Sequence, residues 1–189
     1  RLQSVKSPCK IHKQYLAAVS GTLPVDMPGV WHTLDLPLMQ DPENHLKMKT
    51  AADLSLHSSA LSGKIKTAVT HYHTLFSSQD WSLITLKLDT GRTHQIRAHF
   101  KSIRHPLFND PEYGGNEILK GTTFTKYKQF VQNCFALCPR QALHAKTLGF
   151  EHPGTGKWMD FNSEIPQDIQ QLIEKWRDYV AKRELEDIE

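Results

Sequence analysis

Hydrophobic and polar positions alternate along two pairs of neighbouring segments, and this alternation is typical of β-hairpins. The first pair covers residues 66–76 and 81–88, joined by the polar turn 77–80. In its second strand, Ser82, Ile84, Leu86 and Leu88 face one way and the residues between them face the other. The second pair covers residues 142–151 and 158–161, around a Pro-Gly turn. Apolar runs at 15–19 and 33–38 predict two further short strands.

Three other segments show the spacing of amphipathic helices. Ile96, Phe100 and Ile103 recur at i, i+4 and i+7, which predicts a helix capped by Thr93 and ending near Ile103. A second helix is expected over 125–135, and a third has Pro166 near its first turn. The predicted core face of this third helix is Ile169, Leu172, Ile173, Trp176 and Val180. Paired strands broken by separate helices predict an α+β domain over residues 1–189. Residues 22–63 are expected to be mostly irregular, and residues 184–189 to form a frayed acidic tail.

Composition narrows the class of protein. The chain has 189 residues, 39% hydrophobic and 23% charged, as expected for one soluble globular domain. No apolar run is long enough for a transmembrane helix and no signal peptide opens the chain, so we expect a cytoplasmic protein without a membrane partner. Basic residues precede the first acidic residue, Asp26, and acidic residues gather at the C-terminus. A basic body of this kind permits a polyanionic partner.

Cysteine and histidine offer little evidence of a metal site. The three cysteines, Cys9, Cys134 and Cys138, lack the spacing of a disulfide framework. We expect structural thiols in a reducing compartment; a metal site using Cys134, Cys138 and His144 is the less favoured alternative. Eleven histidines are present, but none has the spacing of a metal-ligand motif, so no metal is expected.

Residues 89–99 read DTGRTHQIRAH and form the most informative segment. Gly91 allows a tight turn from strand to helix, and the N–H groups that open the helix suit an anion. Arg92 can add a charged contact to phosphate, and Arg97 can pair at two points with a carboxylate. His94, Arg97, Lys101 and Arg104 form a basic stripe along the helix. A solvated basic face is the plainer interpretation of the same stripe.

This segment, TGRTHQIR at 90–97, is followed by HP-x-x-x-D-x-x-Y-G at 105–114, and together they resemble a signature of RluA-type RNA pseudouridine synthases. Other blocks of the family agree in order: KQYLA at 13–17, LDLPL at 34–38, Gly63 with Ala68, Thr70 and Tyr72, and RQALHA at 140–145. The resemblance spans roughly residues 10–177. The run at 118–145 is most similar to Bacteroidetes members, which favours a bacterial source.

The resemblance implies a catalytic domain with a mixed, mainly antiparallel bent sheet flanked by helices, here incomplete. The reaction it implies breaks the N1–C1′ bond of a uridine in RNA and rejoins the uracil through C5, without cofactor or metal. It implies that Arg97 pairs with the catalytic aspartate and that Tyr15 packs on the uracil. The residues expected to contact RNA are Lys13, Arg92, Thr93, His94, Gln95 and Lys101. Large-subunit ribosomal RNA is the first expectation for the partner and transfer RNA the second, with the protein monomeric.

One departure from the family concerns the catalytic aspartate, which lies in an H-R-[LI]-D-x-x-T-S-G block upstream of the K-x-Y motif. Only 14 residues precede Tyr15 here, and none is acidic. Asp89 belongs to the TGRTHQIR element and Asp110 is expected to hold a turn, so neither is assigned as the nucleophile. We therefore expect this chain alone to be inactive and poorly stable, with an exposed apolar edge where a further strand would pack. The alternative is a catalytically retired RNA-binding or ribosome-assembly factor on the same fold.

Overall fold

The computed structural model describes residues 11–54, 65–78, 80–118 and 125–186. Expectations that concern Cys9, Gly63 and residues 187–189 lie outside these ranges.

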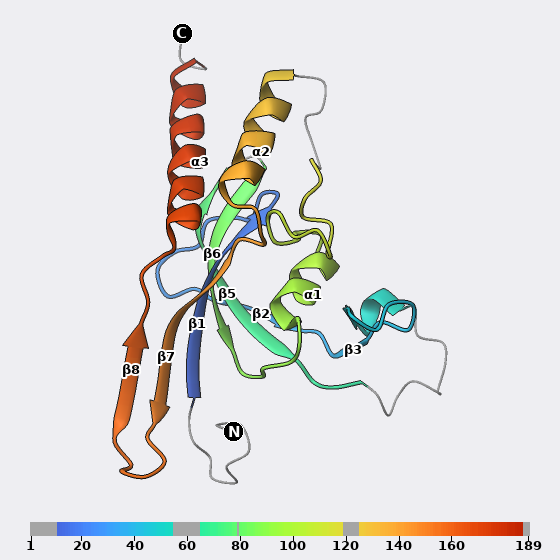
Figure 1. Ribbon diagram of the computed structural model, residues 1–189, viewed down its shortest axis with the longest axis vertical. Coiled ribbons are helices and arrows are strands. Elements are labelled where there is room, and N and C mark those ends of the chain that lie inside the picture. The colour runs from blue at the N-terminus through green and yellow to red at the C-terminus, as the bar shows by residue number, and fades with distance from the viewer. Residues whose placement is uncertain (1–10, 55–64, 79, 119–124, 187–189) are drawn as a thin grey trace.

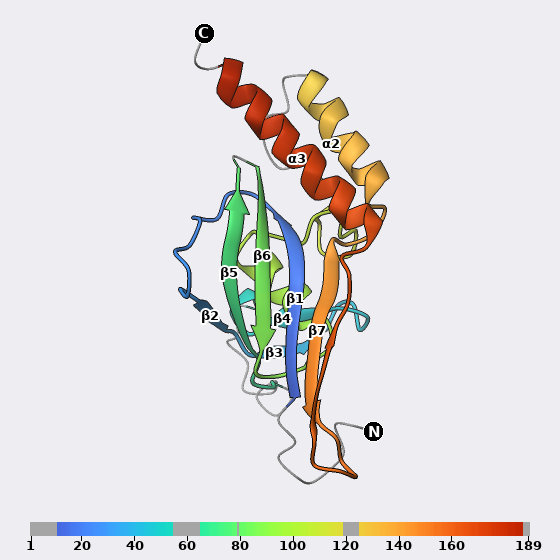
Figure 2. The same cartoon turned by 90° about the vertical axis from the view of Figure 1, so that its left-hand side faces the viewer.

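An antiparallel sheet forms the centre of the described part (Figures 1 and 2). Its six strands lie in the order β2-β5-β6-β1-β7-β8. Their bounds are β1 Ile11–Ser20, β2 His32–Asp35, β5 Val69–Ser77, β6 Trp81–Leu88, β7 Leu143–Glu151 and β8 Trp158–Asn162. Both predicted hairpins are confirmed as β5–β6 and β7–β8. Every strand pairing in the described ranges is antiparallel, so they contain no parallel part of the mixed sheet that was expected.

The single strand expected at 33–38 is wrong. β2 ends at Asp35 and pairs with β5, whereas β3 (Leu38–Gln40) pairs with β4 (Met48–Thr50) in a separate two-stranded sheet. Pro37 lies between them, and because proline has no N–H to donate, it interrupts a strand. A short 3₁₀ helix, η1 (Ala52–Leu54), follows β4.

Each face of the large sheet has its own core. On one face, Trp81 and Leu83 of β6 pack with Trp176 and Leu172 of the terminal helix α3. On the other face, Ile84 and Leu86 of β6 pack with Ala17 and Val19 of β1 and with the first helix, α1. Figure 2 shows the sheet nearly face-on, with α1 behind it. The alternation predicted along β6 therefore decides which side chains meet which helix.

The three helices match the predicted segments with small shifts. They are α1 (Gln95–Ser102), α2 (Thr125–Leu137) and α3 (Gln167–Glu186). Helix α1 has His94 at its N-cap, in the left-handed conformation with φ 50°, and not Thr93 as expected. Ile96 and Phe100 are buried as predicted, because they point into the cluster beneath α1. Helix α3 continues to Glu186, so its backbone is still helical where a frayed tail was expected to begin.

The loop after α1 is tied to the sheet by backbone hydrogen bonds. Phe108 donates its N–H to the carbonyl of Ala18 at 2.9 Å, and its own carbonyl accepts the N–H of Ala142 at 2.9 Å. Gly115 closes the loop, and a Cβ at this position would lie 1.7 Å from the carbonyl oxygen of Leu107. Only glycine fits there, so the loop returns beneath α1 in one fixed path.

Cys134 on α2 and Cys138, the residue after its last turn, are free and fully buried in the core between α2, α3 and the sheet. Burial raises the pKa of the Cys134 thiol to about 12, so this side chain is a protonated apolar group. This position fits the structural role expected for them. None of the helices in the described ranges is long and apolar enough to cross a membrane.

Candidate active site around Arg97

The turn between β6 and α1 is held closed by the side chain of Gln95. Its amide oxygen accepts hydrogen bonds from the Thr90 hydroxyl at 2.8 Å and the Arg92 N–H at 3.0 Å. Its amide nitrogen donates to the carbonyl of Val69 and the hydroxyl of Thr70 on β5, both at 3.0 Å. The RTHQ segment therefore has a defined shape before any ligand binds.

This geometry corrects one expectation. Gln95 was expected to contact RNA, but only 2% of the residue is exposed and both ends of its amide are bonded inside the protein. Gln95 shapes the turn instead. Arg92 and Thr93 are exposed on the outside of this turn, and the Arg92 Nε donates to the carbonyl of Thr67 at 3.1 Å. The structure therefore leaves these two side chains accessible to a partner.

Arg97, in the first turn of α1, forms a two-point ion pair with Asp110 of the following loop. Its Nε and Nη2 donate to Oδ2 and Oδ1 of Asp110, each at 2.7 Å. The Asp110 side chain is fully buried, and that of Arg97 is 11% exposed. Oδ1 also accepts the N–H groups of Glu112 and Tyr113 at 3.1 and 3.3 Å. Asp110 thus organises the turn, as expected, and also pairs with Arg97, which sequence reasoning missed.

A second chain of hydrogen bonds holds the other side of the Arg97 guanidinium. Its Nη1 donates to Nε2 of His94 at 3.1 Å. Burial, and next the positive charge of Arg97, lower the pKa of His94, so the imidazole is neutral and its proton is on Nδ1. Nδ1 donates to the Tyr113 hydroxyl at 3.1 Å, which also accepts the Met48 N–H at 2.9 Å. Arg97 is thus connected to the backbone of the small sheet.

Glu112 is the third partner of Arg97, with Oε2 lying 2.6 Å from Nη2. The hydrogen bond to Asp110, followed by the charges of both carboxylates, raises the pKa of Arg97, so it stays fully charged. Lys101, one turn further along α1, is exposed and lines a shallow cavity of about 340 Å³ with Glu112, Tyr113 and Gly114. One expected RNA contact therefore lines this depression, and the expected catalytic arginine contacts two of its lining residues, Glu112 and Tyr113.

Tyr15 and Lys13 lie on β1. Tyr15 is half-buried and packs on the cluster that also contains Ile96 and Phe100 of α1, so it lies on the α1 side of the sheet. Burial raises the pKa of its phenol. Lys13 lines a separate groove of about 740 Å³ that runs across the lower end of the sheet beside Asp89. Lys13 thus lines a different cavity from Lys101, whereas Tyr15 packs beside α1.

Strand β8 forms one edge of the large sheet, and its five residues are all exposed. Three of them are large and apolar: Trp158, Met159 and Phe161 are 46%, 37% and 50% exposed. Figure 1 shows the β7–β8 hairpin extending beyond the helices. Strand β8 therefore presents apolar side chains at this edge of the sheet, and the expected edge beside a further strand stays a prediction.

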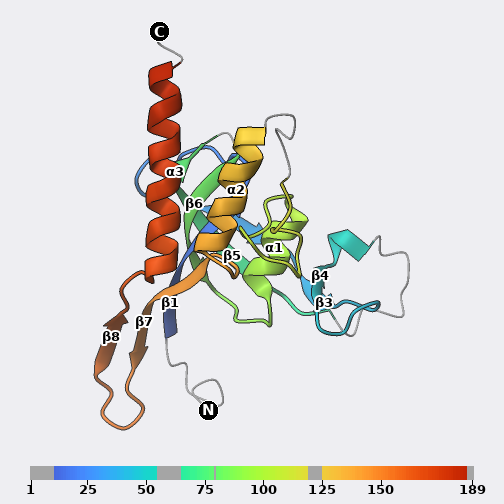
Figure 3. The ribbon, with the colours of Figure 1, turned by 45° about the horizontal axis from the view of Figure 1, so that its top comes forward.

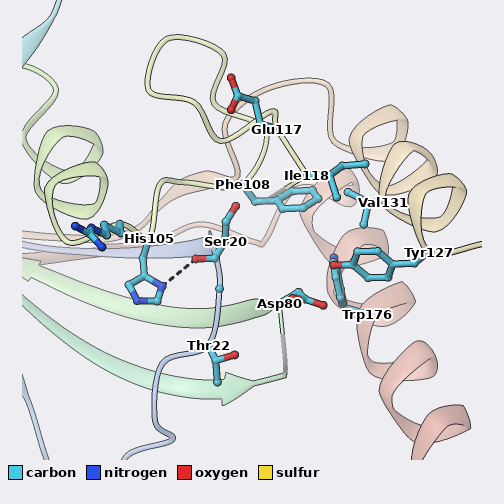
Figure 4. A pocket seen from close by; sticks show the side chains of 12 residues that line it. Ser20, Thr22, Asp80, His105, Phe108, Glu117, Ile118, Tyr127, Val131 and Trp176 are labelled. Atoms are coloured by element: carbon cyan, nitrogen blue, oxygen red, sulfur yellow. Dashed lines mark hydrogen bonds between the residues drawn. The ribbon is translucent and has the colours of Figure 1, made fainter. Parts of the chain in front are cut away.

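A cavity of about 440 Å³ lies at the other end of the sheet, beneath α2 (Figure 4). Phe108, Val131 and Trp176 form its apolar wall, and Tyr127 and Asp80 point into the same space. Burial and the nearby Asp80 carboxylate raise the pKa of the Tyr127 phenol. Figure 3 shows α2 and α3 together at this end, and the buried residues of α1 belong to the core cluster on the other face of the sheet. None of the residues expected to act in catalysis lines this cavity.

The amino-acid sequence is similar to a known protein family and to individual bacterial proteins. The sequence profile of a family described as RNA pseudouridylate synthase matches residues 3–102. The chain is 38% identical over 168 residues to ribosomal large subunit pseudouridine synthase D of Zymomonas mobilis, covering 86% of this chain and 44% of that protein. It is 35% identical over 167 residues to the uncharacterized RNA pseudouridine synthase YlyB of Bacillus subtilis, covering 88% of this chain and 45% of that protein. The chain thus spans less than half the length of these relatives.

The fold is also similar to that of a solved structure. Human RNA pseudouridylate synthase domain containing 4 superposes with a TM-score of 0.63 at 23% identity, over 88% of this chain and 62% of that one. The chain therefore shares the arrangement of its sheet and helices with this human protein.

Proposed function

Because the chain belongs to the RNA pseudouridine synthase family, of the RluA and RluD type, we propose that it is part of an enzyme that isomerises uridine to pseudouridine in RNA. Large-subunit ribosomal RNA is the proposed substrate, because the Zymomonas mobilis relative and that of Xanthomonas campestris are named for that activity. Transfer RNA is the second possibility. The reaction needs a carboxylate, and the aspartate that supplies it is proposed to come from residues that this chain does not include.

The observation that carries this proposal is the way Arg97 is held. Asp110 binds one side of the guanidinium and His94 the other, so the group has a fixed orientation at the surface of α1. A preorganised guanidinium stabilises an ionised carboxylate beside it, which suits a nucleophile or base that must stay charged. Arg97 is proposed to pair with the catalytic aspartate, and Tyr15 to pack on the uracil.

The RNA backbone is proposed to lie over the β6–α1 turn. Arg92 and Thr93 are exposed there, His94 follows beside Arg97, and Lys101 is exposed further along α1. Lys13 would contact RNA from the groove at the start of β1. Gln95 supports this surface from below by closing the turn.

The test uses ribosomal RNA labelled with tritium at C5 of uridine, because the label is released when C5 becomes the glycosidic carbon. A longer polypeptide that includes the catalytic aspartate should release tritium, and its Arg97→Lys variant should be far slower because lysine cannot form the two-point pair. The 189-residue chain by itself should release none. RNA binding without tritium release by the longer polypeptide would refute the proposal and favour a binding factor on the same fold.

A further inference from the structure

Arg97 contacts two carboxylates that differ sharply in burial. The Asp110 side chain is 0% exposed, whereas that of Glu112 is 46% exposed. Asp110 is also bonded to two backbone N–H groups of its own turn. One partner is therefore built into the fold, and the other reaches the guanidinium from the surface.

The two carboxylates also use different edges of the guanidinium. A guanidinium offers a carboxylate a side edge, made of Nε and Nη2, and an end edge, made of Nη1 and Nη2. Asp110 takes the side edge with both oxygens. Glu112 Oε2 lies 2.6 Å from Nη2, the nitrogen that the side edge and the end edge share. A further carboxylate that pairs with Arg97 at two points must therefore compete with Glu112.

We propose that Glu112 is the exchangeable partner of Arg97: it pairs with Nη2, the nitrogen that the end edge shares, and yields this contact to the catalytic aspartate, while Asp110 stays in place. This inference rests on the proposed function. Glu112 then acts as a positioning residue, because it keeps Arg97 oriented until the reacting carboxylate arrives.

The local charges favour such an exchange. Two carboxylates already face one guanidinium, and the neutral His94 adds no positive charge. A third carboxylate in contact would be repelled by both, and the departure of Glu112 removes one of these repulsions. Exposed ion pairs contribute little, so Glu112 leaves at small cost, whereas a fully buried partner such as Asp110 does not. The loop need not move, because the Glu112 N–H stays bonded to Asp110.

Kinetics of the polypeptide that includes the catalytic aspartate test the exchange. Glu112→Gln should raise kcat/KM for tritium release by about two- to five-fold, the range expected when a weak competing ion pair is removed. The acid limb of the pH–rate profile should move to lower pH, because the catalytic carboxylate no longer shares Arg97 with a second charge. Glu117→Gln is the matched control, since it makes the same charge change at an exposed position of the same loop. An unchanged or lower kcat/KM with an unmoved acid limb would overturn the inference.

A crystal structure of the same polypeptide tests the exchange without any activity. The catalytic aspartate should lie on the Nη1–Nη2 edge of Arg97, with Glu112 turned towards solvent. Glu112 still bound to Nη2 would overturn the inference. If the exchange is seen and no tritium is released, the proposed function fails while the exchange stands, so the two failures are distinguishable.

Discussion

Replacing Asp110 by asparagine should destabilise the chain more than any other single change of charge near Arg97. Asparagine keeps the shape of the side chain and one oxygen for the turn N–H groups. The other oxygen, Oδ2, becomes an NH₂ group that faces the Nε–H of Arg97, and the guanidinium loses its paired charge. Breaking a buried ion pair by changing one partner costs about 3–5 kcal/mol. Because Arg97 keeps 11% exposure and its contact with Glu112, we expect the lower end, about 3 kcal/mol.

Urea unfolding of the 189-residue chain, followed by tryptophan fluorescence, measures this loss. With a denaturant slope of about 2 kcal/mol per molar, the Asp110→Asn midpoint should fall by roughly 1.5 M. The control is Glu112→Gln, which removes the exposed carboxylate from the same guanidinium and should cost no more than about 1 kcal/mol.

The comparison of these two variants tests whether burial makes Asp110 the permanent anchor of Arg97. If Asp110→Asn and Glu112→Gln shift the midpoint equally, burial does not distinguish the two carboxylates, and the assignment of Asp110 as the permanent anchor is wrong. If Asp110→Asn unfolds the chain completely, addition of sucrose, which favours the compact state, restores a measurable transition.

Three further predictions follow from other parts of the structure. Gly115→Ala should cost about 1–3 kcal/mol, seen as a lower thermal midpoint, because its Cβ would meet the Leu107 carbonyl; Gly154→Ala, with no atom closer than 3.5 Å, should have little effect. Burial lowers the pKa of His99, so the free energy of unfolding should fall as pH drops below about 6.5, by up to about 1.4 kcal/mol per pH unit for this residue. Urea unfolding at two pH values should show a weaker dependence in His99→Gln; an equal dependence would contradict this assignment. Arg92→Ala should weaken RNA binding and reduce the salt slope by about one counterion, whereas Arg177→Ala on α3 should leave both unchanged in filter-binding assays.

Local patterns in the sequence determined most of the secondary structure. The two hairpins and three helices follow from periodicity and turn residues, which act over a few neighbours and so can be detected without a fold. The same reasoning failed at residues 33–38, because both halves of that segment suit a strand and only their partners, β5 and β4, reveal two sheets. The N-cap of α1 is His94 and not the expected Thr93. The His94 side chain contacts Arg97 and Tyr113, and spacing along the chain does not reveal the contact with Tyr113.

The sequence alone also determined the family and identified Arg97 as a residue that pairs with a carboxylate, because the ordered motifs are read directly from the chain. It did not determine which carboxylates lie beside Arg97. Asp110 and Glu112 are 13 and 15 positions away along the chain, and only the return of the loop beneath α1 brings them to the guanidinium. The burial of Gln95 was likewise decided by the approach of β5 to the turn. Spacing along a chain reports neighbours within one helix or strand, whereas burial and charge pairing depend on which distant segments the fold brings together.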